Sequence, residues 1–326
     1  MAACLYLVDS SGNLEWYNHL GSEDGTPHWA NSGQGKIVGS GWDAFSQIVG
    51  GGDGTLYAIR RDGLLEWYKH AGYGEGTPAW ANGGQGKVIG NGWDAFTQVI
   101  GGSHGILYAI RRDGIIEWYN HVGFRDGTTA WANGGQGIQI GNGWDVFKQV
   151  TGGSDGVLYA IRKDGVLEWY NHVGFHDGTP AWANGGQGKQ IGTGWNVFNA
   201  VLGASSGIIY GIQESGLLEW YKHVGWQTGA SIWGNAGCVR IVGSGFNGPG
   251  KSSKSALPTG SLMLNPLVAR MITKVVIAVG RNLLINTPVN PQDPGRSNPS
   301  DTRVPTIPPS DFTGDIVIRP DTPNTA

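Results

Sequence analysis

Residues 56–68 have the sequence LYAIRRDGLLEWY, which returns at 107–119 as LYAIRRDGIIEWY and at 158–170 as LYAIRKDGVLEWY. The apolar letters on both sides of the Asp-Gly pair predict two strands. Asp-Gly suits the positive φ angles of the tight turn between them. The segment therefore predicts a β-hairpin that occurs more than once in the chain.

The hairpin belongs to a repeat of 51 residues that runs through five copies without an insertion. Four aromatic series mark the copies: Tyr6, Tyr57, Tyr108, Tyr159 and Tyr210; Trp16, Trp67, Trp118, Trp169 and Trp220; Trp29, Trp80, Trp131, Trp182 and Trp233; and Trp42, Trp93, Trp144 and Trp195, with Phe246 in the fifth place. After the hairpin of the second copy, a glycine-rich loop spans Gly72 to Gly86. Lys87–Gly90 predicts a third strand and Phe96–Ile100 a fourth. Four short strands per repeat are typical of a propeller blade, and no helical periodicity appears. The sequence thus predicts an all-β, five-bladed β-propeller over residues 5–248.

The composition narrows the possible partners. Glycine accounts for 58 of 326 residues, charged residues for 14%, and the net charge is −3. A chain with so little positive charge is not expected to bind nucleic acid by bulk electrostatics. Met1 leads straight into the first repeat with no signal-peptide pattern, so we expect a cytoplasmic protein or one exported without a classical signal. Cys4 and Cys238 are too few for a disulfide framework and are expected to be reduced thiols.

The sequence changes character after Phe246, where 12 of the 15 prolines lie. Residues 249–286 are interpreted as a linker and an apolar β-like segment, and residues 287–326 as a Pro-rich, disordered tail. The apolar stretch from Leu262 to Ile285 contains Pro266, Arg270, Lys274 and Arg281. It is too interrupted for a membrane span, so no membrane insertion is expected.

The fifth copy stops before the strand that begins with Phe in the other four copies, as in Phe45–Val49. A blade without one strand leaves an open sheet edge, which is an aggregation hazard. One hypothesis is that Val275–Val279 supplies the missing strand. The alternative, an unstructured tail, stays open.

The repeated motifs resemble those of the tachylectin-2 family. The resemblance rests on Leu107–Gly114, Trp118-Tyr119, Trp131 and Ile140–Phe147, with their counterparts in the other copies, and covers residues 5 to about 246. It implies a five-bladed lectin that binds N-acetylglucosamine and N-acetylgalactosamine, with one site at each blade boundary. It does not extend to the C-terminal segment.

One difference concerns the residues before the looped Trp, where the family has Asp-Asn. This chain has Pro27-His28, Pro78-Ala79, Thr129-Ala130, Pro180-Ala181 and Ser231-Ile232. An Asn instead follows two residues after each looped Trp. An aromatic face and an amide together suit a sugar, because the ring covers C–H groups while the amide satisfies hydroxyls. The candidate carbohydrate-binding residues are therefore Trp29, Asn31, Trp80, Asn82, Trp131, Asn133, Trp182, Asn184, Trp233 and Asn235. The alternative is that the Trp fills the gap between blades and the Asn caps a turn.

Other repeated positions favour structural roles. The Gly-Trp-Asp segments, such as Gly41–Asp43, are expected to pack between blades, and the Glu of Glu-Trp-Tyr is expected on a solvated face. A metal ring of His19, His70, His121, His172 and His223 is less favoured than hydrogen bonding at strand ends, because no other ligand type lies nearby. The segment from Gly84 is similar to a phosphate loop but opens no helix. No catalytic set stands out from the repeats, so neither an enzyme nor a cofactor is expected.

Copies two to four are nearly identical, loops included. Similar loops suit a multivalent binder, because linked weak sites gain avidity, here enough to agglutinate microbes or cells. Recent duplication explains the same identity without a function. The sequence therefore favours a multivalent lectin for N-acetylated hexosamines, with a protein–protein scaffold as the alternative. It leaves the exact sugar and the oligomeric state open.

Overall fold

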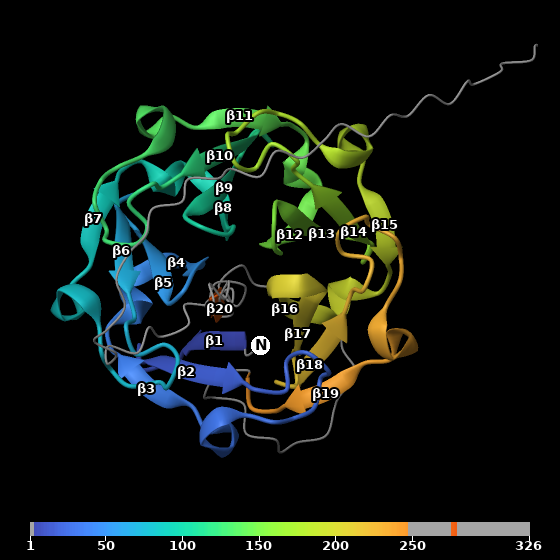
Figure 1. Cartoon of the computed structure of the whole chain (residues 1–326), viewed down its shortest axis with the longest axis horizontal. Helices are drawn as coiled ribbons and strands as arrows, with labels where there is room; N and C mark the ends of the chain where they lie inside the picture. Colours follow the sequence, from blue (N-terminus) through green and yellow to red (C-terminus); the bar gives the residue numbers. More distant parts are fainter. Residues whose placement is uncertain (1–2, 247–274, 279–326) are drawn as a thin grey trace, which may run out of the picture. The chain divides into compact units, whose positions relative to one another are not determined.

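The predicted hairpins form the middle of five four-stranded antiparallel sheets, which stand as blades around a central axis (Figure 1). The structure is a computed structural model that describes residues 3–246 and 275–278. The prediction of an all-β, five-bladed propeller is confirmed. Within these described ranges, no helix is long and apolar enough to cross a membrane.

The blades consist of short strands joined by tight turns and single 3-10 turns. The strands are β1 (Ala3–Val8), β2 (Leu14–His19), β3 (Lys36–Gly39), β4 (Phe45–Gly52), β5 (Thr55–Arg60), β6 (Leu65–Lys69), β7 (Lys87–Gly90), β8 (Phe96–Gly101), β9 (Ile106–Arg111), β10 (Ile116–Asn120), β11 (Ile138–Gly141), β12 (Phe147–Gly152), β13 (Val157–Arg162), β14 (Leu167–Asn171), β15 (Lys189–Gly192), β16 (Phe198–Gly203), β17 (Ile208–Gln213), β18 (Leu218–Lys222), β19 (Arg240–Gly243) and β20 (Val275–Ala278). The 3-10 turns are η1 (Ala30–Gly33), η2 (Trp42–Ala44), η3 (Ala81–Gly84), η4 (Trp93–Ala95), η5 (Ala132–Gly135), η6 (Trp144–Val146), η7 (Ala183–Gly186), η8 (Trp195–Val197), η9 (Ser205–Gly207) and η10 (Gly234–Gly237).

The strand that begins with Phe belongs to a different blade from the one expected. Phe96–Ile100 was interpreted as the fourth strand of its own repeat, but β8 is the innermost strand of the next blade, in the order β11-β10-β9-β8. Each repeat thus contributes three strands to one blade and the inner strand to the following one. The incomplete fifth copy consequently leaves the gap at the inner edge of the first blade.

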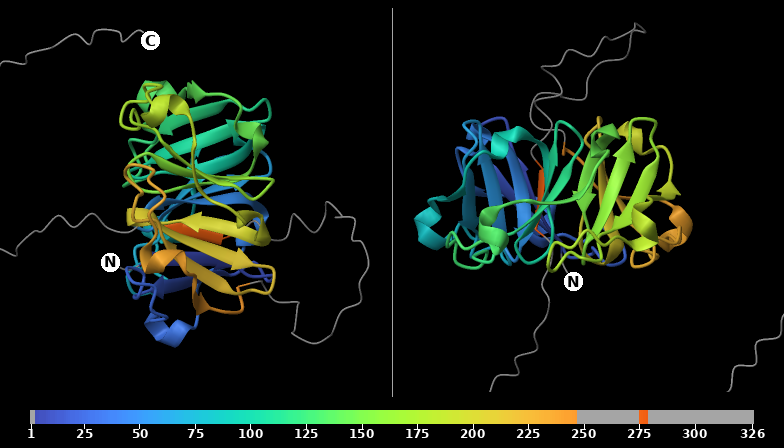
Figure 2. Two further views of the ribbon diagram at one scale, coloured as in Figure 1. Left: turned by 90° about the vertical axis from the view of Figure 1, so that its right-hand side faces the viewer. Right: turned by 90° about the horizontal axis from the view of Figure 1, so that it is seen from above.

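Strand β20 lies in that gap. It pairs antiparallel with β1, with Tyr6 opposite Val276 and Cys4 opposite Ala278 (Figures 1 and 2, orange-red strand). The first blade therefore has the order β20-β1-β2-β3. The rest of the proposed linker at 249–286, including Val279, and the proposed tail at 287–326 lie outside the described residues.

Removing residues 247–326 is expected to lower the thermal midpoint by about 10 °C. The deletion exposes the inner edge of β1, and a loss of about 3 kcal/mol corresponds to that shift for a domain of this size. Circular dichroism melting measures it. The matched control is a deletion of residues 283–326 only, which keeps β20. Equal midpoints for the two truncations would show that β20 contributes nothing to closure.

Five pairs of buried side chains connect the blades to one another. Each Tyr hydroxyl lies 2.7–3.2 Å from Nδ1 of a His on the neighbouring blade. The pairs are Tyr6–His70, Tyr57–His121, Tyr108–His172, Tyr159–His223 and Tyr210–His19. The last pair closes the circle between the fifth copy and the first. All five imidazoles are 0% exposed, and Nε2 of each lies 2.8 Å from a backbone carbonyl.

These contacts fix the protonation of the rings. A carbonyl only accepts, so Nε2 carries the proton and donates it, while Nδ1 accepts from the Tyr hydroxyl. The His series therefore makes hydrogen bonds at strand ends, as the sequence favoured. In the part of the chain that is described, no group of three or more His, Cys, Asp and Glu side chains is placed to hold a metal.

Candidate functional site

The looped Trp residues lie at the blade boundaries. Each is half-buried, and its Nε1 donates to a carbonyl on the outermost strand of the preceding blade at 2.6–2.9 Å, as in Trp80 to Val38. Each indole also packs on the His of its own repeat, with ring centroids 4.4–5.0 Å apart. These contacts hold the long loop against the neighbouring blade.

The Asn residues of the same loops are exposed and adopt the left-handed conformation, with φ between 51° and 55°. Each Nδ2 donates to the carbonyl three residues ahead, as in Asn82 to Gln85 at 3.0 Å. The Asn thus stabilises the turn, and the Trp fills the boundary. The assignment of these ten residues to a sugar site stays a prediction.

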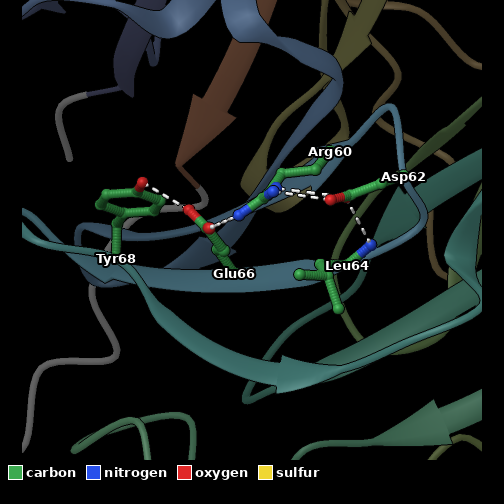
Figure 3. Close-up of polar contacts among 5 residues, drawn as sticks. All are labelled: Arg60, Asp62, Leu64, Glu66 and Tyr68. Atoms are coloured by element: carbon green, nitrogen blue, oxygen red, sulfur yellow. Dashed lines mark hydrogen bonds and ion pairs between the residues drawn. The ribbon is translucent and has the colours of Figure 1, made fainter.

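A different cluster of polar residues lines a pocket in the second, third and fourth copies. Figure 3 shows it in the second copy, where Tyr68 donates to Glu66 Oε2 at 2.7 Å and Arg60 Nη1 lies 3.4 Å from Glu66 Oε1. Arg60 also donates two hydrogen bonds to Asp62, from Nη2 to Oδ2 at 2.6 Å and from Nε to Oδ1 at 3.1 Å. The pocket is further lined by Ala44 and Phe45.

Burial separates the roles of these side chains. The Glu66 side chain is only 12% exposed, whereas Arg60 and Asp62 are 43% and 52% exposed. Glu66 is therefore fixed at the base, and the ion pair lies at the rim, where water screens it and its contribution to stability is small. The rim groups are available to a ligand.

The protonation states suit hydrogen bonding. Burial, followed by the hydrogen bond to Glu66, raises the pKa of Tyr68, so the phenol remains a donor. Partial desolvation raises the pKa of Asp62, but the Leu64 amide and Arg60 outweigh it, and the net pKa is lowered. At neutral pH the pocket thus presents a carboxylate and a guanidinium side by side.

The same geometry recurs in the next two copies. Arg111 lies 2.7 Å from Asp113 and 3.4 Å from Glu117, and Arg162 lies 3.1 Å from Asp164 and 3.5 Å from Glu168. We call these three sets the Arg–Asp pockets: Arg60, Asp62, Glu66 and Tyr68; Arg111, Asp113, Glu117 and Tyr119; and Arg162, Asp164, Glu168 and Tyr170.

The first and fifth copies depart from this arrangement. Asp9 stands where the others have Arg, and its carboxylate accepts from Ser11 and Asn13 in a local turn. In the fifth copy Gln213 replaces the Arg and donates to Glu219, and Ser215 replaces the Asp. Among the described residues the ring therefore carries three Arg–Asp pockets and two polar variants.

Aromatic rings extend the pocket of the fourth copy. Its lining includes Trp144, Tyr170 and Gly186, the last from the loop that carries Trp182. The Trp144 ring lies 4.8 Å from Tyr170 and 5.6 Å from Trp182. The predicted loop thus borders the pocket, with its Trp next to the ring of Trp144. The pocket therefore combines a polar rim with the partly exposed ring of Tyr170.

Glycine leaves room for the Tyr–Glu pair of each pocket. A Cβ on Gly86 would meet the Tyr68 hydroxyl and the Glu66 carboxylate at 2.6 Å, and Gly137 and Gly188 are equally close to their neighbours. Any side chain there would displace the Tyr–Glu pair.

The Trp of Gly-Trp-Asp and the Glu of Glu-Trp-Tyr differ in how they meet the sequence predictions. The Trp of Gly-Trp-Asp is buried, with Trp42, Trp93, Trp144 and Trp195 4–5% exposed, so the expectation of packing is confirmed. The expectation of a solvated Glu was wrong. Glu66, Glu117 and Glu168 are 12–16% exposed, because the Tyr two residues later and the Arg six residues earlier enclose the carboxylate. The signal for the pocket was the joint recurrence of Arg, Asp and Glu in three copies.

No curated protein matches the sequence. Among solved structures, the designed protein Ika8 is 14% identical with a TM-score of 0.31, over 69% of this chain and 55% of that one. Prp20p from Saccharomyces cerevisiae is 10% identical with a TM-score of 0.35, over 72% and 60%. The chain thus spans little more than half of these two proteins. The six-bladed fucose-recognising lectin of Aleuria aurantia is 12% identical with a TM-score of 0.41, over 74% and 92%.

The family comparison is more specific. The profile of the tachylectin family matches residues 7–249, which comprise most of the described propeller. The matched range includes the looped Trp of all five copies and the Gly-Trp segments of the first four. The chain therefore belongs to the tachylectin family of propeller lectins.

Proposed function

We propose that this protein is a multivalent lectin for N-acetylated hexosamines and that the three Arg–Asp pockets are its principal sugar sites. The observation that supports this proposal is the threefold recurrence of one set of polar side chains, with a fixed Glu at the base and an Arg–Asp pair at the rim. Family membership supports carbohydrate binding in general.

The chemistry of the pocket suits a sugar. Vicinal hydroxyls pair with a carboxylate and a guanidinium in fixed directions, and charged partners strengthen these hydrogen bonds. The partly exposed ring of Tyr170, which packs on the buried Trp144, offers an apolar surface to a ring face or an acetamide methyl. Because Arg162 and Asp164 are about half exposed, each site is expected to be weak, and avidity arises from three linked sites.

The Trp and Asn residues of the loops form a second proposed contact surface. Asn184 is exposed on the same loop as Gly186, which lines the pocket of the fourth copy. A sugar seated on Tyr170 would extend its substituents toward this loop. Changing Asn82, Asn133 and Asn184 together to Gly tests the idea, because Gly tolerates the left-handed backbone and removes only the amide.

Titration with monosaccharides tests the proposed function. We expect N-acetylglucosamine and N-acetylgalactosamine to bind with dissociation constants of about 0.1–10 mM, the range in which small ligands with few contacts lie. Glucose, which lacks the acetamide, is expected to bind at least about fivefold more weakly, because a methyl-sized contact is worth about 1–3 kcal/mol. Chemical-shift titration or calorimetry measures this. A folded protein that binds no amino sugar would exclude the lectin and favour the scaffold.

A further inference from the structure

The inner strand of the first blade reaches its place by an unusually long connection. Five residues join the outer strand of one blade to the inner strand of the next at 40–44, 91–95, 142–146 and 193–197. Between β19 and β20 the connection is 31 residues, 244–274. A five-residue link commits a strand to the adjacent blade of its own chain. A link of 31 residues has a maximum reach of about 100 Å and imposes no such commitment.

The inner strand that precedes β20, β16, differs from the other inner strands at one side chain. The Oε1 atoms of Gln47, Gln98 and Gln149 accept from the backbone amides of Val99, Val150 and Val201 on the next inner strand, at 2.9–3.0 Å. These bonds tie β4 to β8, β8 to β12 and β12 to β16. At the equivalent position of β16 stands Ala200, which has no amide to offer to β20. The side-chain tie that joins the other inner strands is therefore missing between β16 and β20, whereas β20 keeps its antiparallel pairing with β1.

The edge of β1 requires an extended partner. Leu5 and Tyr6 are 0–1% exposed, and their strand lies between β2 and β20. An unpaired edge in that position is costly, so some strand has to occupy it. Main-chain pairing of this kind accepts an added strand from the same chain or from another.

We propose that β20 is an exchangeable latch and that the edge of β1 also takes this segment from a second copy of the chain. Two copies that exchange β20 reciprocally form a dimer with the same strand pairs as two monomers. A tether of 31 residues keeps its own strand at an effective concentration of order mM, so dilute native protein stays monomeric. Exchange requires β20 to leave the edge of β1 transiently, and a high protein concentration favours pairing with a second chain. The dimer presents twice as many Arg–Asp pockets as the monomer.

A disulfide between β1 and the end of β20 can trap the exchanged strand covalently. Cys4 is the register partner of Ala278, so Ala278→Cys places two thiols on directly opposite residues of β1 and β20. Cys238, which is exposed, is changed to Ser in the same full-length chain. Two preparations with different tags are mixed, warmed to just below the unfolding midpoint, cooled, oxidised and separated on a non-reducing gel. We expect a cross-linked dimer that carries both tags and whose fraction rises with protein concentration.

Two controls make the result decisive. Adding Ile277→Pro is expected to abolish the dimer. Proline has no backbone N–H, so it disrupts the pairing of β20 with β1. Ser253→Pro, in the connection, is the matched control and is expected to leave it intact. A second measurement uses the unsubstituted chain: two tagged preparations are mixed, and the mass of any complex that carries both tags is determined. Only intrachain cross-links at every concentration, or mixed dimers that survive Ile277→Pro, would overturn the proposal.

Discussion

Acidification below pH 6.5 is expected to reduce the free energy of unfolding steeply. Burial lowers the pKa of His19, His70, His121, His172 and His223, and the backbone carbonyl at Nε2 opposes this only in part. Each ring is fully buried and neutral, with its Nδ1 lone pair occupied by a Tyr hydroxyl. Protonation would place a charge between two blades and turn that acceptor into a donor.

The decrease in stability at low pH follows from proton binding to the unfolded chain. The unfolded chain takes up protons on these rings near pH 6.5, whereas the folded chain takes them up only at lower pH, so the unfolded state is favoured as the pH falls between the two values. Each ring contributes up to about 1.4 kcal/mol per pH unit in that window, and five rings up to about 7 kcal/mol per unit. The lowered pKa values of Asp24, Asp126 and Asp177 act below pH 4, in a separate window.

Urea unfolding between pH 8 and pH 5 measures this dependence. The stability is expected to be flat above pH 7.5 and to fall below pH 6.5. His121→Gln, which stays neutral, is expected to reduce the slope by about one fifth, because one of five titrating groups is lost. Tyr57→Phe is a matched control that removes the hydroxyl facing His121 but keeps the ring. A stability that stays flat to pH 5 would show that the five imidazoles do not remain neutral in the folded propeller.

The fold was predictable because each local signal agreed with the global one. Asp62-Gly63 fixes a hairpin turn, the alternation in Leu56–Ile59 fixes a strand, and the 51-residue period fixes the number of blades. The sequence could not show that Phe96–Ile100 crosses to the next blade. A strand's own pattern is the same whichever sheet it joins, so only three-dimensional packing decides its neighbours.

The candidate site was less predictable for a related reason. Period-two alternation places Glu66 and Tyr68 on one face of β6, but it does not say whether that face meets water or Arg60. Asp62 has the composition of a turn residue, and its turn role concealed its place at the rim of a pocket. Trp80 was the more conspicuous residue, yet its indole nitrogen is satisfied by Val38 across the boundary.

Replacing Asp62, Asp113 and Asp164 together by Asn is expected to abolish retention on surfaces that carry N-acetylglucosamine. The change removes the charge at three rims, and a hydrogen bond to a charged group is worth about 1.5–3 kcal/mol, which corresponds to about 10–100-fold in the affinity of each pocket. Linked weak sites multiply such losses, so binding to a dense surface is expected to fall by more than about 100-fold. Asn also tolerates the turn position, so the hairpin survives.

The single change Asp62→Asn distinguishes three equal sites from one dominant site. We expect two pockets to keep their affinity while the number of bound sugars falls from three to two, because the Arg and the Asp that form each rim come from the same copy. The matched control is Ser215→Ala, at the equivalent position of the fifth copy, where no Arg–Asp pair exists. Native mass spectrometry at saturating sugar counts the sites. Loss of a bound sugar in Ser215→Ala would mean that the fifth copy also binds and that the Arg–Asp pair is not what defines a site.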